Sequence, residues 1–451
     1  MRYLPLTQKQ EDRILKLCQV ESFDQLVQSI PESIRVDGLL RLPEALSEME
    51  LCQHFDNYAN MNSDAKSYLG QGAYDHTWPA VLDYLISRGE FLTAYTPYQA
   101  ELSQGTLQSI FEFQSMIAEM TGMEISNASL YDGSTAALEA ILMAARLQRK
   151  EQGTIIVSEG VYEDTLSLLK TYLDPLNIKI EIWKSDATGQ AQASSAPKVA
   201  DAFGVLLQSP NKWGVVEDWA QLQSAAASLN VKSIAHVPEM HSLTEFSAPG
   251  DFGVDIVSGE GQGYGLPLGY GGPYLGLLCC KKQDVRQIPG RLVGQTEDAT
   301  GQRAFCVTLS TREQHIRREK ATSNICSNQN LMALRAAIYL SLMGPKGLET
   351  VSKMNRSRLF TLQSLLSDTL KTDAVTISTA PCFNELSLHF KSEKTCESLL
   401  RNLESKNILA GHINKAPVES GFQSSLTIAV TEKSCPNSLK VLADAICGEL
   451  K

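Results

Sequence analysis

A glycine-rich stretch stands out first, because seven of the chain's 30 glycines fall within residues 258–273. One apolar run, 254–257, precedes it and another, 274–280, follows it. Glycine at this density lets the backbone adopt conformations and approach distances that side chains forbid. One turn does not need seven glycines, so the stretch predicts a loop that lies against a ligand or another chain rather than a plain turn.

A second motif, Asp132-Gly133-Ser134-Thr135, precedes a predicted helix over 136–147. The free N–H groups and the dipole of a helix N-terminus attract an anion such as phosphate. A plain N-cap by Ser134 or Thr135 explains the same residues without a ligand. We favour the plain cap.

A third motif is a basic run in a chain whose net charge is −11. Ala321-Thr322-Ser323-Asn324 ends the run and precedes a predicted helix over 328–342, whose N-terminus could bind an anion. The alternative is a solvated charged turn. The basic residues are Arg312, Arg317, Arg318 and Lys320.

The histidines and cysteines predict neither a metal site nor a disulfide framework. His236 and His241 stand at a spacing known from zinc sites, but no cysteine pair accompanies them. We expect structural or surface roles for these two and for His76 and His315. The ten cysteines form no C-x-x-C pair, which favours free thiols in a cytoplasmic chain.

Composition argues against nucleic-acid binding, secretion and a membrane-spanning helix. The pI of about 5.3 makes nucleic acid an unexpected partner. The first residues contain no long apolar run, so we expect no secretory signal, and no stretch approaches the ~20 apolar residues of a membrane-spanning helix.

The elements that must position these motifs follow from the apolar pattern. Short apolar runs alternate with helical patterns from about residue 150 to 257, which predicts a mostly parallel sheet covered by helices on both faces. We expect an N-terminal helical arm over 1–66, a large domain over 67–345 and a small α/β domain over 346–451. The predicted strands are 154–157, 179–183, 204–207, 231–237 and 254–257.

Several strings resemble the glycine decarboxylase P-protein family, whose members are pyridoxal phosphate enzymes of the aspartate-aminotransferase fold, also called fold type I. The resemblance covers essentially the whole chain and implies that fold. Ala100 stands where the family usually has Pro. The strings are the glycine stretch, Thr93-Ala-Tyr-Thr-Pro-Tyr-Gln99, Gln208-Ser-Pro-Asn211 and 309–326.

Alignment on Gly271-Gly272-Pro273 places Gln262 at the family's cofactor-lysine position. An amide forms no Schiff base with an aldehyde, so no covalent cofactor is expected here. In two-chain members of the family, the chain called subunit 1, or alpha, carries Gln at this point, and this chain is identified as a member of that group. The resemblance therefore implies that the lysine-bearing partner holds the pyridoxal phosphate.

Further site residues are implied by the resemblance alone. Residues 158–162 lack the family's His-Pro, whose histidine would stack on the pyridine ring, and 236–241 stand where an aspartate would pair with the ring nitrogen. The implied assignments are Tyr95 and Tyr98 for the glycine pocket, Thr322, Ser323 and Asn324 for the partner's cofactor phosphate, and Gly133, Ser134 and Thr135 for a vestigial phosphate cup.

The implied activity is that of glycine dehydrogenase (aminomethyl-transferring), an oxidoreductase active only as a complex. Glycine and the oxidised lipoyl group of H-protein would give carbon dioxide and an aminomethyl-lipoyl adduct. The implied partners are the lysine-bearing subunit 2, in an alpha2-beta2 assembly, and lipoylated H-protein.

Two other functions remain open. A stand-alone aminotransferase or cysteine desulfurase needs a lysine near the glycine stretch, whereas Lys281 and Lys282 lie past the next strand. A scaffold or regulatory paralogue would be favoured if residues 95–98 and 322–324 departed from the family's sequence pattern. These residues instead stay close to that pattern.

Overall fold

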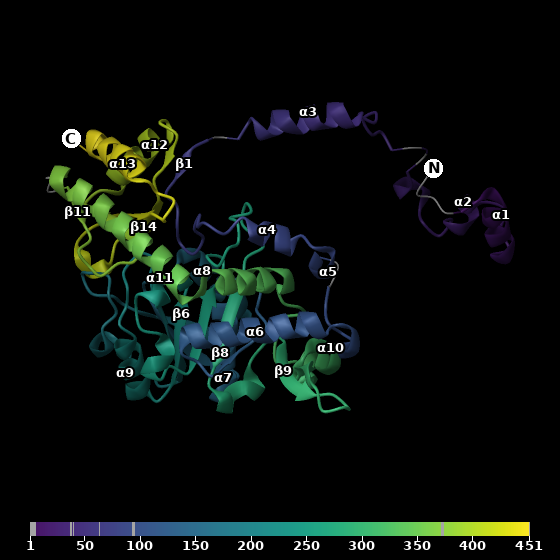
Figure 1. Ribbon diagram of the computed structural model, residues 1–451, viewed down its shortest axis with the longest axis horizontal. Helices are drawn as coiled ribbons and strands as arrows, with labels where there is room; N and C mark the ends of the chain where they lie inside the picture. The colour runs from purple at the N-terminus through teal and green to yellow at the C-terminus, as the bar shows by residue number, and fades with distance from the viewer. Residues whose placement is uncertain are drawn as a thin grey trace. The chain divides into compact units, whose positions relative to one another are not determined.

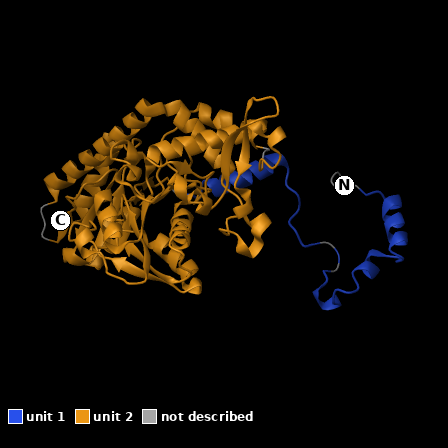
Figure 2. Ribbon diagram, turned by 90° about the horizontal axis from the view of Figure 1, so that it is seen from below, with its two compact units in different colours: residues 1–63 blue, residues 64–451 orange. Residues whose placement is uncertain are grey.

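The computed structural model describes residues 6–36, 38, 40–62, 64–92, 95–370 and 374–450. The chain divides into two units, residues 1–63 and 64–451, which Figure 2 colours separately. The three-part division at residues 66 and 345 stays a prediction. Among the described residues, no helix is long and apolar enough to cross a membrane.

The described residues of the first unit form three α-helices, and none of the side chains described in them is buried. Thr7 precedes the first as its N-cap, and Ser47 caps the third by accepting from the backbone N–H of Glu50. Large apolar side chains such as Phe23, Met49 and Phe55 are exposed. The helices are α1 (Gln8–Leu17), α2 (Phe23–Leu26) and α3 (Glu48–Ala59).

Among the described residues, seven strands form the large sheet of the second unit in the order β2-β8-β7-β6-β5-β3-β4. Figure 1 labels two of them, β6 and β8. β3 to β7 run parallel, whereas β8 pairs antiparallel with β7 and β2, so the predicted, mostly parallel sheet is confirmed. The strands are β2 (Ile125–Ser126), β3 (Gly153–Ser158), β4 (Ile178–Trp183), β5 (Ala202–Gln208), β6 (Lys232–Val237), β7 (Ile256–Glu260) and β8 (Gly276–Cys280).

The observed strand bounds differ from the predicted ones by up to three residues, and the largest difference is at the end of β7. β7 continues past Val257 to Glu260, because its ladder with β8 extends to the pair Glu260 and Gly276. The first three residues of the glycine-rich stretch therefore belong to a buried strand, and the loop begins at Gly261.

Helices cover both faces of the large sheet, since side chains of a strand alternate between its two faces. Val205 and Leu207 of β5 join a core with α6, α9 and the first half of α11. Leu206 joins the other core, with α7 and α8. These helices are α6 (Gln104–Thr121), α7 (Gly133–Leu147), α8 (Glu163–Leu173), α9 (Trp219–Leu229) and α11 (Asn330–Thr369).

The long helix α11 leads into the C-terminal part of the unit. Two helical runs meet at Gly344, whose φ of 57° is not helical, so the helix is kinked at this residue. The second run packs with two helices on an antiparallel sheet in the order β11-β12-β15-β14. The elements are β11 (Val375–Ile377), β12 (Glu385–Phe390), β14 (His412–Lys415), β15 (Ser424–Ala429), α12 (Glu393–Glu404) and α13 (Pro436–Glu449).

Short elements complete the second unit. β1 (Lys66–Ser67) pairs parallel with β13 (Ile408–Leu409), and β9 (Leu292–Glu297) forms a hairpin with β10 (Arg303–Thr308). The remaining helices are α4 (Val81–Ile86), α5 (Gly89–Leu92) and α10 (Gln314–Arg317).

Candidate functional site

A cavity of about 280 Å³ lies where β3, β6 and β7 end and α7 begins; we name it the sheet-end cavity. Parallel sheets bind ligands at this edge, outside the carboxyl ends of their strands. It is lined by Gln71, Gly72, Ala73, Tyr131, Asp132, Gly133, Ser134, Tyr162, Asp164, Thr165, His236, Pro238, Glu260, Gly271, Pro273, Tyr274 and Gln329.

The carboxylate of Glu260 occupies the anion-attracting end of α7. Its Oε2 accepts from the backbone N–H of Gly133 at 2.8 Å, and its Oε1 accepts from those of Gln262 and Leu275 at 2.9 Å each. The side chain is 5% exposed. Burial raises the pKa of Glu260 to about 7 against the effect of these donors.

A second carboxylate caps the same helix. Oδ1 of Asp132 accepts from the backbone N–H of Thr135 at 2.7 Å, so Asp132 is the N-cap and the expected cap by Ser134 or Thr135 is wrong. The preference of Asp for the N-cap explains the difference, because its oxygen reaches the N–H two or three positions on. A phosphate approaching α7 would therefore face two carboxylates.

His236 lines the cavity, in the segment where the family resemblance implies an aspartate that would pair with a pyridinium nitrogen, and it shares its Nδ1 with the Ser258 hydroxyl at 3.0 Å. Burial lowers the pKa of His236 to about 4, so the ring is neutral at pH 7 and cannot serve as the anion that pairs with a protonated pyridine.

Gln262 is 1% exposed and has its amide fully engaged. Its Nε2 donates to the carbonyl oxygens of Tyr74 at 3.0 Å and Leu266 at 2.8 Å, and its Oε1 accepts from the Tyr74 N–H at 2.8 Å. The residue at the family's lysine position thus holds two backbone segments together.

The residues present do not fit pyridoxal phosphate. The cavity lining includes Asp132, Asp164 and Glu260, and no lysine or arginine is among the described residues that line it. A phosphate dianion there would meet like charges at short range, which is strongly unfavourable in a partly desolvated site.

Beside the cavity, Arg291 joins two loops into one exposed face. Its Nη1 donates to Thr96 Oγ1 at 3.1 Å and to Asn328 Oδ1 at 3.3 Å, and its guanidinium lies 5.9 Å from the ring centre of Tyr98. Tyr95 and Tyr98 are 74% and 76% exposed. Thr93 and Ala94 of the same string lie outside the described residues.

The second of these loops, 322–329, reaches the edge of the cavity. Thr322 and Ser323 line a small hollow with Arg291 and Arg312, and Asn324 is exposed. The backbone N–H of Cys326 donates to the Tyr131 hydroxyl at 3.1 Å, and Tyr131 and Gln329 both line the cavity. We name residues 95–98, Arg291 and 322–329 the loop face.

The structure brings only some of the expected site residues together. Gly133 and Ser134 line the sheet-end cavity, while Thr135 and Gln262 do not. Tyr98 shares Arg291 with the 322–329 loop, and no contact of Tyr95 with that loop is described. His315 is exposed, whereas His76 and His241 are buried together around Glu239.

Sequence reasoning missed Glu260 and Arg291. A signal existed for Glu260, since a lone carboxylate directly after a buried apolar strand is unusual. Arg291 lies in the string 286–294, which matches the family, but nothing in that string assigns the arginine a role.

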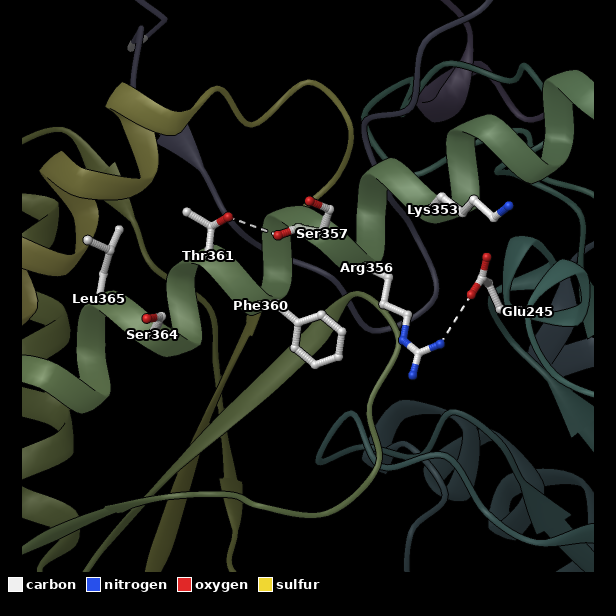
Figure 3. Close-up of a pocket in the computed structure, with 8 residues that line it drawn as sticks. All are labelled: Glu245, Lys353, Arg356, Ser357, Phe360, Thr361, Ser364 and Leu365. Atoms are coloured by element: carbon white, nitrogen blue, oxygen red, sulfur yellow. Dashed lines mark hydrogen bonds and ion pairs between the residues drawn. The ribbon is translucent and has the colours of Figure 1, made fainter.

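A larger hollow, of about 630 Å³, runs along the second half of α11 (Figure 3). Two interactions lie within it: Arg356 bonds Glu245 at 3.1 Å, and Thr361 Oγ1 donates to the Ser357 carbonyl oxygen at 2.9 Å. The Arg356 guanidinium also lies 5.4 Å from the Phe360 ring. This arrangement is typical of a packed helix surface, so the sheet-end cavity and the loop face remain the candidates.

Comparison with known proteins bears on the whole chain. The family model described as Glycine cleavage system P-protein matches residues 1–446. Proteins named probable glycine dehydrogenase (decarboxylating) subunit 1 are 42% identical in Chloroherpeton thalassium, over 99% of both chains, and 39% identical in Moorella thermoacetica, over 100% of both.

Solved structures agree with this match. A crystal structure of glycine decarboxylase (P-protein) of the glycine cleavage system, in inhibitor-bound form, superposes with a TM-score of 0.86 at 36% identity, covering 100% of each chain. Glutamate decarboxylase of Lactobacillus brevis shares the fold alone, with a TM-score of 0.67 at 12% identity over 93% of this chain and 96% of that one. The predicted fold type I architecture is confirmed, and the chain belongs to the glycine cleavage system P-protein family.

Proposed function

We propose that this chain is the non-lysine subunit of a two-chain glycine decarboxylase and is active only in complex with a lysine-bearing chain. The observation that carries the proposal is Gln262, which stands at the cofactor-lysine position with its amide fully bonded to the backbone. The relatives named subunit 1 match along their full length, which supports a second subunit.

The reaction would convert glycine and the oxidised lipoyl group of H-protein into carbon dioxide and an aminomethyl-lipoyl adduct. Pyridoxal phosphate, held by the lysine-bearing chain, would supply the electron sink for decarboxylation. The two carboxylates at the start of α7 support this assignment, because they oppose phosphate in this chain's own cavity.

This chain would contribute the loop face to the partner's site. Tyr95 and Tyr98 would serve the glycine pocket, and Thr322, Ser323 and Asn324 would donate hydrogen bonds to the partner's cofactor phosphate. The exposure of both tyrosines and the position of the 322–329 loop beside Arg291 and Arg312 support these roles, since an exposed polar surface near cations suits an anionic ligand held by another chain.

The first unit would add apolar surface to the same assembly. None of the side chains described in its three α-helices is buried, so the apolar faces of these helices gain free energy only by packing on another surface. We assign that surface to the lysine-bearing chain, in an alpha2-beta2 complex.

The test is to purify each chain alone, mix them, and measure glycine–bicarbonate carbon exchange with lipoylated H-protein, with the complex mass from light scattering. We expect exchange only from the mixture. Exchange from this chain alone would contradict the proposal, and a tight but inactive complex would favour a scaffold.

Two variants test the loop face within that complex. We expect Thr322→Ala to weaken cofactor retention by the partner roughly 10-fold, the size of one hydrogen bond to a charged group. Tyr95→Phe should raise the KM for glycine. Thr350→Ala, on the exposed surface of α11, is the matched control and should change neither.

A further inference from the structure

A cluster of buried ionisable side chains lies behind the glycine-rich loop and outside the sheet-end cavity. His76 precedes α4, while Glu239 and His241 directly follow β6. Their exposed fractions are 2%, 1% and 0%. We name these three residues the histidine cluster.

The three side chains converge on one point. His76 Nε2 lies 3.1 Å from Glu239 Oε2, and His241 Nδ1 lies 3.1 Å from Glu239 Oε1. One donor atom from each residue lies within 4.8 Å of the other two. Two atoms that bind the same zinc ion at about 2.0–2.2 Å lie roughly 3 to 3.5 Å apart, and the two nitrogen–oxygen distances of 3.1 Å match that spacing.

The far side of each imidazole is anchored, as metal-binding histidines require. His76 Nδ1 lies 2.9 Å from Glu432 Oε2, and His241 Nε2 lies 3.2 Å from the Tyr339 hydroxyl. Glu432 is itself fixed by the N–H and hydroxyl of Thr77. Such outer contacts set the tautomer so that the inner nitrogen of each ring can bind a metal.

Gly263 packs closely against the cluster. A Cβ on Gly263 would lie 3.0 Å from His241 Nδ1 and 3.3 Å from His76 Cδ2. Any larger residue would press against the two rings, so glycine at this point lets the two histidines keep their positions.

The negative charges of two buried carboxylates at the cluster also need compensation. Glu239 and Glu432 are both buried, and the ion pairs described for them come only from His76 and His241. Two buried carboxylates are costly unless cationic charge compensates them, and one divalent cation would balance both.

We propose that His76, Glu239 and His241 bind a zinc ion, with Glu432 and Tyr339 orienting the two histidines. Two imidazoles and one carboxylate are a ligand set that zinc accepts. The ion would tie the segment before α4 to the loop after β6. The inference is independent of the proposed function, and it departs from the structural roles expected for these histidines from sequence.

A proton is the competing occupant of this site. Burial lowers the pKa of His76, but Glu239 and Glu432 outweigh that effect and raise the pKa to about 10. The experiment must therefore detect the metal itself rather than a change in stability alone.

The first measurement uses the untagged, full-length wild-type chain purified without chelators. We expect elemental analysis by mass spectrometry to find about one zinc per chain. After zinc is replaced, Co²⁺ should give visible d–d absorption that zinc abolishes. Absence of both signals in the folded wild type would overturn the proposal, whether or not the chain supports glycine decarboxylation.

Variants then locate the ion. Glu239→Gln should abolish the Co²⁺ signal, and Glu432→Gln should weaken Co²⁺ binding about 10- to 100-fold, as loss of an outer partner does. His236→Asn, which alters a buried histidine outside the cluster, should bind Co²⁺ as the wild type does. Equal Co²⁺ affinity in Glu239→Gln and the wild type would also refute the site.

Discussion

The side-chain amide of Gln262 and the backbone of Tyr74 exchange two hydrogen bonds, of 2.8 and 3.0 Å, across 188 residues of sequence. A third bond, of 2.8 Å, runs from the same amide to the Leu266 carbonyl. The residue at the cofactor-lysine position is therefore a structural clamp between the glycine-rich loop and the segment before α4. Restoring a lysine there would remove the clamp.

Gln262→Lys should therefore fail to create a cofactor site. A lysine ammonium cannot accept from the Tyr74 N–H, and one unpartnered buried donor costs about 1–3 kcal/mol of the free energy of unfolding. Incubation with pyridoxal phosphate and borohydride should trap no specific adduct at residue 262 by peptide mass spectrometry. Gln152→Lys, on an exposed turn, controls for the added charge. A stoichiometric adduct at residue 262 would show that Glu260 and Asp132 do not exclude phosphate.

Arg291→Ala should lower the activity of the assembled complex without unfolding this chain. The change removes the shared anchor of Thr96, Asn328 and the Tyr98 ring, and displacement of a binding surface by about 1 Å can cost 10²-fold in rate. We expect kcat/KM for glycine to fall about 10- to 100-fold. Arg291→Lys should recover little, since an ammonium lacks the planar fork of donors. Arg401→Ala, exposed on α12, is the control, and unchanged kinetics in Arg291→Ala would remove the loop face from the site.

Glu385 should make stability depend on pH between its ordinary and its shifted pKa. It is fully buried, its Oε1 accepts from the Gln71 N–H at 2.8 Å, and its Oε2 has no hydrogen-bond partner among the described residues. Burial raises the pKa of Glu385 from 4.5 to about 7. The folded state thus holds a proton that the unfolded state releases. The stability that this proton contributes is complete below pH 4.5 and is lost as the pH rises through 7.

Glu385→Gln keeps the acceptor for Gln71 and removes the titration. The difference in free energy of unfolding between variant and wild type should grow by up to about 1.4 kcal/mol per pH unit within that window, in favour of the variant. Urea unfolding at pH 5 and pH 8 measures it. Parallel curves for the two proteins would mean that Glu385 is ionised throughout.

The sheet and its covering helices were predictable because their signals are local. Apolar runs of strand length recur between helical patterns, and Gly122 ends α6 in the left-handed conformation that the Thr-Gly pair predicts. The kink at Gly344 follows from the Gly-Pro pair in the same way. Each of these needs only a few neighbouring residues.

The candidate site was less predictable because its contacts join distant segments. Glu260 accepts a hydrogen bond from Gly133, which is 127 residues away in the sequence. His76 is hydrogen-bonded to Glu239, which is 163 residues away. The sequence alone places Gln262 at the family's cofactor-lysine position, but it does not reveal that the Gln262 amide bonds the backbone of Tyr74. The N-cap of α7 was predicted wrongly for a simpler reason. Residues 132–135 are four consecutive polar or small residues, and several of them could cap a helix. The backbone conformation in the structure identifies Asp132 as the N-cap.

The start of β8 offers a last test of how tightly α7 is held against the sheet. A Cβ on Gly276 would lie 2.4 Å from the Asp132 carbonyl oxygen, and the Leu130 N–H donates to the Gly276 carbonyl at 2.8 Å. Gly276→Ala must push the N-cap of α7 away from β8, so we expect a loss of at least about 3 kcal/mol in the free energy of unfolding. Gly105→Ala, in the first turn of α6 with nothing within 4 Å of its Cβ, should instead gain about 0.5–1 kcal/mol. Urea unfolding of both variants decides the matter, because a tolerated Gly276→Ala would mean that the backbone around Asp132 can yield and that the cavity beside it is not rigid.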